Sequence, residues 1–291
     1  MCSARMTGGQ LPVIALFGVG QIGGSLGMAW RKAGATVLGV DREPPHEAVR
    51  LGALDQAATL EEALAQADVL VLAAPLSAVL EAAERFGSRV RPGTVVTDVS
   101  SVKGPVVEAW NRALAPGAAF VGGHPMFGRE VSGVANASPE LARGSRWILT
   151  PSARSTAEAV TLVQYLALLA GAGAVPAMTP EEHDRRIAAI SHLPQMVATA
   201  LAAAAMETEE QLGNTIDLSA GGFRDTTRIA GSPAAMWTEI LLANRGALRE
   251  VLTSFRQALD ALEEGDAEAI RQVFSQAHAA RLRLPVNREE R

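Results

Sequence analysis

The residues best suited to bind a nucleotide stand near the N-terminus of the chain, where three glycines follow a short apolar run. Their spacing, Gly-x-Gly-x-x-Gly, permits a tight strand-to-helix turn and close approach of a phosphate to the backbone. Free N–H groups at the start of the following helix then face an anion. The pattern therefore predicts a site for the pyrophosphate of a dinucleotide. The predicted cofactor residues of this segment are Gly18, Gly20, Gln21, Ile22 and Gly23.

An acidic residue at the end of the next apolar run indicates which dinucleotide is bound. Asp41 directly follows the apolar run 36–40. A carboxylate at this place accepts hydrogen bonds from the adenosine ribose hydroxyls, and it would repel a 2′-phosphate. We therefore expect NAD. The adjacent Arg42 is able to pair with a 2′-phosphate, so NADP stays an alternative.

Two further polar clusters follow apolar runs and are candidates for catalysis. One is Asp98-Val-Ser-Ser-Val-Lys103, and the other is Gly122-Gly-His124-Pro-Met-Phe-Gly128. Ligands of doubly wound sheets bind at the carboxyl ends of the strands, where these clusters fall. We expect His124 on a loop just beyond a strand, with a pKa near neutrality that suits general acid–base work.

In the second half of the chain, the candidate substrate-binding residues are arginines. Arg224 and Arg228 stand beside glycines in the segment 221–228, and arginine binds carboxylates through two parallel hydrogen bonds. We therefore predict a carboxylate clamp there. His183 and Asp184, at the head of a long helical pattern, are expected to form a solvated first turn.

The elements that must position these residues follow from the alternation of apolar runs and helical patterns. Strands are expected at 13–17, 36–40, 68–73, 94–98, 119–122 and 146–150, with 175–178 as a further candidate. Alternation of this kind predicts an α/β fold with a doubly wound, mostly parallel sheet. Beyond Pro180 only helical patterns occur, with a kink expected at Pro194. The predicted parts are a disordered leader over 1–10, a Rossmann-type domain over 11–179 and an all-α domain over 180–291.

Composition narrows the class of protein. The formal net charge of −5 over 291 residues argues against broad nucleic-acid binding. Cys2 is the single cysteine, which excludes disulfides within the chain and suits the reducing cytoplasm. The histidines lack metal-ligand spacing, so no metal is expected. Glycines interrupt the apolar stretch 11–30, so we expect neither a signal peptide nor a membrane anchor.

Taken together, these motifs resemble one family, the prephenate and arogenate dehydrogenases of tyrosine biosynthesis. The matching segments appear in the family's order and are GVGQIGGS (18–25), DVSSVKG (98–104), GGHPMFG (122–128), SHLPQ (191–195) and FRDTTRIA with the later Trp237. The resemblance implies an NAD-dependent oxidative decarboxylation of prephenate to 4-hydroxyphenylpyruvate. It also implies a homodimer in which the helical domains of two subunits interlock.

The resemblance further implies roles for individual residues. His124 is similar to the family's catalytic histidine. Ser101 is similar to the serine that hydrogen-bonds the substrate hydroxyl and helps orient that histidine, and we expect it to contact the cofactor. Arg228 matches an arginine that holds a substrate carboxylate. The other residues expected to bind substrate are Glu130, Gln195, Gly221 and Trp237.

Several alternatives stay open at this point. Many prephenate-specific members read SHLPH, whereas this chain has Gln195, so arogenate or dual specificity competes with prephenate. β-Hydroxyacid dehydrogenases and pyrroline-carboxylate reductases also join a Rossmann domain to helices. The catalytic helix lysine usual in the former is not evident here, because the chain has only Lys32 and Lys103. A non-catalytic, NAD-sensing regulatory protein is the alternative from another class.

Overall fold

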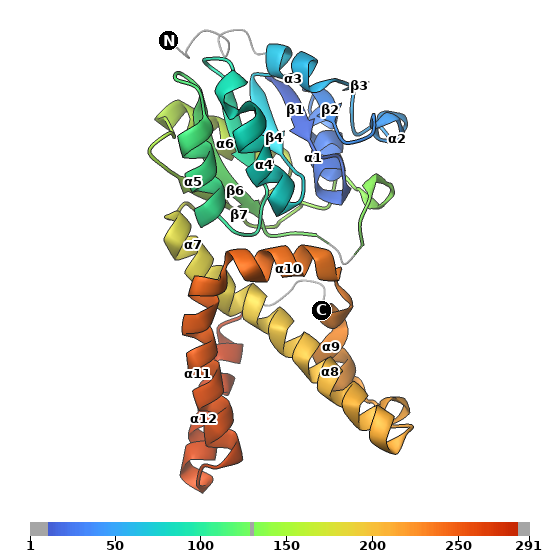
Figure 1. Cartoon of the computed structure of the whole chain (residues 1–291), viewed down its shortest axis with the longest axis vertical. Helices are drawn as coiled ribbons and strands as arrows, with labels where there is room; N and C mark the ends of the chain where they lie inside the picture. Colours follow the sequence, from blue (N-terminus) through green and yellow to red (C-terminus); the bar gives the residue numbers. More distant parts are fainter. Residues whose placement is uncertain (1–10, 129–130, 285–291) are drawn as a thin grey trace. The chain divides into compact units, whose positions relative to one another are not determined.

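A computed structural model describes residues 11–128 and 131–284 (Figure 1). The first part of the chain forms a seven-stranded sheet with the order β3-β2-β1-β4-β5-β6-β7. All neighbouring strands are parallel except β6 and β7, which are antiparallel. The strands are β1 (Val13–Phe17), β2 (Thr36–Val40), β3 (Gln56–Ala57), β4 (Val69–Leu72), β5 (Val95–Asp98), β6 (Ala119–Pro125) and β7 (Trp147–Pro151). The predicted doubly wound sheet is confirmed.

Helices cover both faces of this sheet and create two separate apolar cores. Along β1, Ile14 and Leu16 point into one core and Ala15 into the other. This alternation follows from the two-residue repeat of a strand. One core contains residues of α1 and α6, and the other contains residues of α3, α4 and α5. The helices of this part are α1 (Gln21–Lys32), α2 (His46–Arg50), α3 (Leu60–Gln66), α4 (Leu76–Phe86), α5 (Gly104–Ala113) and α6 (Ala157–Leu169).

From Pro180 onward, all the described elements are helical. They are α7 (Pro180–Ile187), a π-helical turn (Ala188–His192), α8 (Leu193–Leu212), α9 (Gly221–Thr227), α10 (Ala234–Ala243), α11 (Arg245–Glu263) and α12 (Ala267–Leu282). The kink expected at Pro194 corresponds to the π-helical turn just before it. Pro194 is the second residue of α8, which continues the π-helical turn without a break, so its missing N–H falls where the hydrogen-bond pattern changes from π to α.

The chain divides into two compact units, one ending at Asn244 and one beginning at Arg245. The first unit holds the sheet together with α7 to α10, and the second holds the paired helices α11 and α12. The domain boundary at residue 180 stays a prediction. The helical stretch Pro180–Leu212 is long and apolar enough to cross a membrane. Core helices of soluble proteins share this length and composition.

Two expectations about strands were wrong in detail, and one short strand was not expected. The strand expected at 119–122 continues to Pro125, because Gly123, His124 and Pro125 pair with β7. The candidate strand 175–178 forms one isolated bridge instead, between Leu149 and Ala177. The two-residue strand β3 was not predicted, because a segment so short carries no periodicity.

Candidate active site

The glycine turn has the shape that the sequence predicts for a phosphate cradle. Gly18 has a φ of +95°, and a Cβ atom there would lie 2.6 Å from the carbonyl oxygen of Ala73. A Cβ atom on Gly23 would lie 2.3 Å from the carbonyl oxygen of Gly18, so only glycine fits at these two positions. A Cβ atom on Gly20 would meet nothing within 4 Å. Gly20 caps α1, so this open space lies at the N-terminus of that helix, with Gln21 and Ile22 in its first turn.

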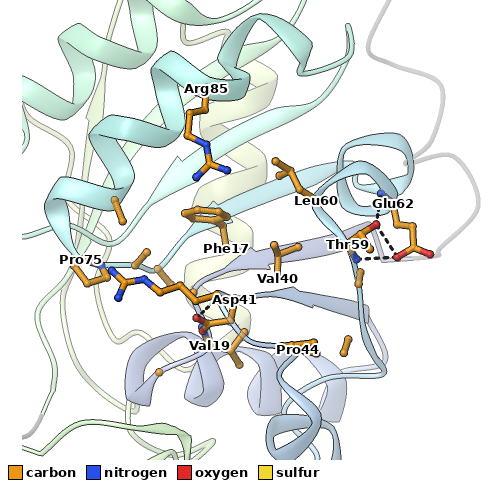
Figure 2. Close-up of a pocket in the computed structure, with 18 of the residues that line it drawn as sticks. Phe17, Val19, Val40, Asp41, Pro44, Thr59, Leu60, Glu62, Pro75 and Arg85 are labelled. Atoms are coloured by element: carbon orange, nitrogen blue, oxygen red, sulfur yellow. Dashed lines mark hydrogen bonds between the residues drawn. The ribbon is translucent and has the colours of Figure 1, made fainter.

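A cavity of about 830 Å³ extends from this turn along the end of β2 (Figure 2). Both oxygens of the Asp41 side chain accept backbone hydrogen bonds, from Val19 N at 2.8 Å and from Arg42 N at 2.7 Å. The carboxylate is thereby fixed at the cavity wall. Arg42 and Arg85 also line the cavity. The space, the anion-binding turn and the fixed carboxylate fit a dinucleotide with an unmodified ribose.

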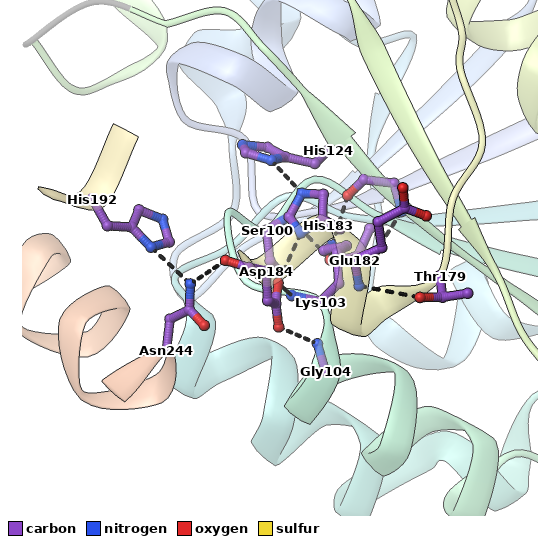
Figure 3. Close-up of polar contacts among 12 residues, drawn as sticks. Ser100, Lys103, Gly104, His124, Thr179, Glu182, His183, Asp184, His192 and Asn244 are labelled. Atoms are coloured by element: carbon purple, nitrogen blue, oxygen red, sulfur yellow. Dashed lines mark hydrogen bonds and ion pairs between the residues drawn. The ribbon is translucent and has the colours of Figure 1, made fainter. Parts of the chain in front are cut away.

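His124 lies within β6 rather than on the loop expected from the sequence, and only 7% of its surface is exposed. Its Nδ1 atom is 2.8 Å from Nε2 of His183 (Figure 3). Burial first, and then His183, Lys103 and His192, hold the pKa of His124 well below its usual 6.5. The expectation of a pKa near neutrality was therefore wrong, because the ring is enclosed among other nitrogen bases. The lowered pKa favours the neutral imidazole form of His124.

His183 and Asp184 were expected to be solvated, and this was wrong. His183 is fully buried, and Asp184 is 8% exposed. The Nδ1 atom of His183 is 2.7 Å from Oδ1 of Asp184, whose two oxygens also accept hydrogen bonds from the backbone of Lys103 and Gly104 at 2.8 Å. The first turn of α7 is therefore docked on the N-terminus of α5. Sequence patterns gave no signal for this contact, because it joins segments 80 residues apart.

A buried ion pair contacts Gly123, the residue that precedes His124. Lys103 and Asp98 both have no exposed surface, and Nζ of Lys103 donates to Oδ2 of Asp98 and, at 2.7 Å, to the carbonyl oxygen of Gly123. Asp98 also accepts hydrogen bonds from the backbone N–H groups of Ser100 and Gly123, both at 3.0 Å. The pair thus ties the loop after β5 to the residue that precedes His124.

His192 belongs to the SHLPQ segment and contacts Asn244 and Trp237. It is fully buried, and its Nδ1 atom is 3.0 Å from Nδ2 of Asn244, which also donates to the carbonyl oxygen of Asp184 at 2.9 Å. The His192 ring packs edge-on against Trp237, with ring centroids 5.9 Å apart. Burial lowers the pKa of His192 to about 4. His192 and Asn244 were not among the residues predicted from the sequence.

The other predicted residues occupy several places. Ser101 is partly exposed in the loop after β5. It directly follows Ser100, whose backbone N–H donates to Asp98. Gln195 is buried and donates through Nε2 to the carbonyl oxygen of Ile229 at 2.9 Å, next to the exposed Arg228. Gly221 begins α9. Glu130 lies outside the described residues. Within residues 11–128 and 131–284, no group of three or more His, Cys, Asp or Glu side chains is arranged to hold a metal ion.

These features define a class of protein: a nucleotide-binding Rossmann protein with a buried basic site at the carboxyl ends of its strands. Comparison with known proteins narrows this class. The family model for the nucleotide-binding domain of prephenate dehydrogenase matches residues 26–176, and the model for its dimerization domain matches residues 179–276. The chain belongs to the prephenate dehydrogenase family.

Individual relatives agree with this assignment. A prephenate dehydrogenase of Bacillus subtilis is 35% identical over 95% of this chain and 77% of that protein. The crystal structure of Aquifex aeolicus prephenate dehydrogenase with hydroxyphenyl propionate and NAD+ has a TM-score of 0.85 and 30% identity, covering 94% of this chain and 98% of that chain. A Synechocystis arogenate dehydrogenase has a TM-score of 0.79 and 29% identity, covering 92% of this chain and 98% of that chain.

Proposed function

We propose that this protein is an NAD-dependent prephenate dehydrogenase, which converts prephenate to 4-hydroxyphenylpyruvate and CO₂. The observation that carries the proposal is the buried His124, whose pKa is lowered by burial, on the same sheet as a dinucleotide turn. A neutral imidazole is the form that accepts a proton. A hydride acceptor and a base at the carboxyl ends of one sheet are what the oxidation of an alcohol requires.

The residues of the site suit the chemistry of this substrate. Prephenate carries a hydroxyl at ring carbon C4 and a carboxylate at C1. When bound, the oxidised nicotinamide supplies the acceptor for the hydride of C4. His124 takes the hydroxyl proton, and the O–H electron pair forms the C4 carbonyl. The C1 carboxylate then leaves as CO₂, its bonding electrons pass into the ring, and the resulting phenolate recovers a proton.

Arg228 is proposed to hold a carboxylate of the substrate. Replacement by alanine removes a charge-assisted hydrogen bond, so the KM for prephenate is expected to rise by about 10- to 100-fold while the KM for NAD stays unchanged. Initial rates at varied concentrations of each substrate measure this. The matched control is Arg112→Ala, because Arg112 is also exposed and lies on α5, outside the segment 221–228. Equal effects on both Michaelis constants would remove Arg228 from the clamp.

We assign the choice between prephenate and arogenate to the surroundings of Gln195. Its amide nitrogen donates to Ile229 and, at 3.3 Å, to Oγ1 of Thr199, so it braces the segment that carries Arg228. We infer a preference for prephenate, with arogenate or dual specificity as the alternative. The NAD preference rests on Asp41, whose fixed carboxylate would repel a 2′-phosphate.

The test compares kcat/KM for prephenate and arogenate, each with NAD and with NADP. Absorbance at 340 nm measures formation of the reduced cofactor. We expect the prephenate–NAD combination to be highest, and NAD to exceed NADP by at least about tenfold, since a like charge nearby costs on the order of 1–4 kcal/mol. Higher kcat/KM with arogenate would reverse the substrate assignment. Tight NAD binding without reduction in any combination would favour the regulatory alternative.

We also infer a cytoplasmic homodimer. The matched dimerization model supports the dimer, as do large apolar side chains left exposed on α8, namely Leu201, Met206 and Leu212. Within the separate second unit, Phe274 of α12 is 66% exposed. Exposed apolar surface of this kind is typical of association faces. The low cysteine content is consistent with a reducing compartment.

A further inference from the structure

The hydrogen bonds around His183 determine which nitrogen of His124 carries a proton. The Asp184 carboxylate accepts only, so His183 must donate to it through Nδ1–H. Burial opposes ionisation of Asp184, but the hydrogen bonds from His183, Lys103 and Gly104 hold its pKa below the usual value, so it is ionised. Burial also lowers the pKa of His183, which is therefore neutral and has a lone pair on Nε2.

The lone pair of His183 then fixes the state of His124. Because Nε2 of His183 is an acceptor, the Nδ1 atom of His124, 2.8 Å away, must be the donor. The lone pair of His124 consequently lies on Nε2, the ring nitrogen that His183 does not occupy. A free histidine in water has no such constraint. The contact selects the tautomer whose outer nitrogen is ready to accept a proton.

The charges act differently on the two rings. Those around His124 oppose an imidazolium there, whereas Asp184 and Asp98 favour one at His183. The groups that face His124 are His183 on α7, Lys103 before α5 and His192 at the start of α8. Those that face His183 are His124, His192, Asp184, Lys103 and Asp98. Asp98 and Lys103 neutralise one another as a pair, which leaves the Asp184 carboxylate as the uncompensated charge. One added proton on the histidines therefore makes this buried cluster neutral.

We propose that His183 and Asp184 are positioning residues that hold His124 in its Nδ1–H tautomer and stabilise the imidazolium formed during turnover. The inference rests on the proposed function in taking His124 as the base. The proton passes from the substrate hydroxyl to Nε2 of His124, and Nδ1–H remains bonded to His183. The Asp184 carboxylate offsets the new positive charge through His183, as the aspartate does in Ser-His-Asp sites. One chain supplies all three residues, because His124 lies on β6 and the other two lie on α7.

The decisive measurement is the tautomer itself, observed in the full chain labelled with ¹⁵N-histidine. Long-range ¹H–¹⁵N correlation spectra distinguish a protonated Nδ1 from a protonated Nε2 in each ring. We expect His124 to be neutral with Nδ1 protonated, assigned by the loss of its signals in His124→Asn. Protonation at Nε2 of His124 in the unaltered chain would overturn the proposal. This result does not depend on which substrate the enzyme uses, or on whether it turns over.

Kinetics of three variants provide the second measurement. His183→Phe removes the acceptor and is expected to lower kcat by about 10²-fold or more with an unchanged Kd for NAD. His183→Gln offers an amide oxygen to His124 and should recover at least about tenfold of that loss. Asp184→Asn removes the charge that stabilises the imidazolium, so the acidic limb of the pH profile should move to lower pH by about one unit.

The matched control for these variants is Glu182→Gln, which neutralises an exposed carboxylate on the same turn of α7. It should leave both kcat and the pH profile unchanged within about twofold. A purely structural role for His183 and Asp184 would lower the amount of folded enzyme without moving the acidic limb. An unmoved limb in Asp184→Asn, or equal turnover in His183→Phe and His183→Gln, would contradict the proposal. Absence of NADH formation by the unaltered chain with prephenate and with arogenate would instead contradict the proposed function.

Discussion

Replacement of His124 by asparagine is expected to lower kcat by about 10²–10⁴-fold while NAD affinity stays unchanged. Asparagine is close to histidine in its first atoms and is able to donate toward His183, but it has no basic nitrogen. The loss therefore isolates proton transfer from packing. The Kd for NAD stays constant because the glycine turn and Asp41, which we propose to hold the cofactor, lie at other strand ends.

Initial rates at saturating prephenate and NAD measure the effect, and a direct binding titration measures the Kd. The matched control is His278→Asn, because His278 is exposed on α12 in the second unit. Turnover within about threefold of the unaltered chain would show that another group takes the proton.

Replacement of Lys103 by methionine is expected to lower the free energy of unfolding by about 3–5 kcal/mol. The reason is that the Asp98 carboxylate stays behind in a fully buried place without its cation. Burial lowers the pKa of Lys103, and Asp98 opposes that shift, so the two charges stabilise each other. Because Asp98 also holds Gly123 N, the loss of the pair is expected to disturb the strand end that carries His124.

Urea unfolding of single and double variants tests this account. The double variant Asp98→Asn with Lys103→Met removes both charges and should be more stable than Lys103→Met alone. Lys32→Met is the matched control, since Lys32 is the other lysine of the chain and is 73% exposed in its ion pair with Glu140. It should change stability by less than about 0.5 kcal/mol. A Lys103→Met chain as stable as the unaltered one would contradict a buried, mutually stabilising pair.

Much of the sheet was predictable because its strands are buried on both faces. The strands 13–17 and 36–40 were predicted with the observed bounds, since parallel strands inside an α/β fold are continuous apolar runs. The last residues of β6 were missed because Gly123 and His124 have little intrinsic strand preference. They are held in the strand by pairing with β7, which is a tertiary effect.

The site was predictable where residue type and local spacing carry the signal. The glycine turn, Asp41 and His124 belong to short motifs, and the structure places them at or near strand ends. His183 was misjudged because the first turn of a helix is usually solvated, and nothing local shows that α7 packs on α5. Lys103 and Asp98 stand in one predicted cluster, but the bond from Lys103 to the carbonyl oxygen of Gly123 was hidden, since it connects separate segments. Glu130 lies outside the described residues, and its role stays a prediction.

The central claim is that hydride transfer to NAD is coupled to loss of the ring carboxylate. The most direct measurement follows the prephenate–NAD reaction with prephenate labelled with ¹³C at that carboxylate. The account predicts that ¹³CO₂ and NADH form in equal amounts, together with 4-hydroxyphenylpyruvate, and that His124→Asn slows both products to the same extent. Formation of NADH without ¹³CO₂, or of neither product, would contradict it.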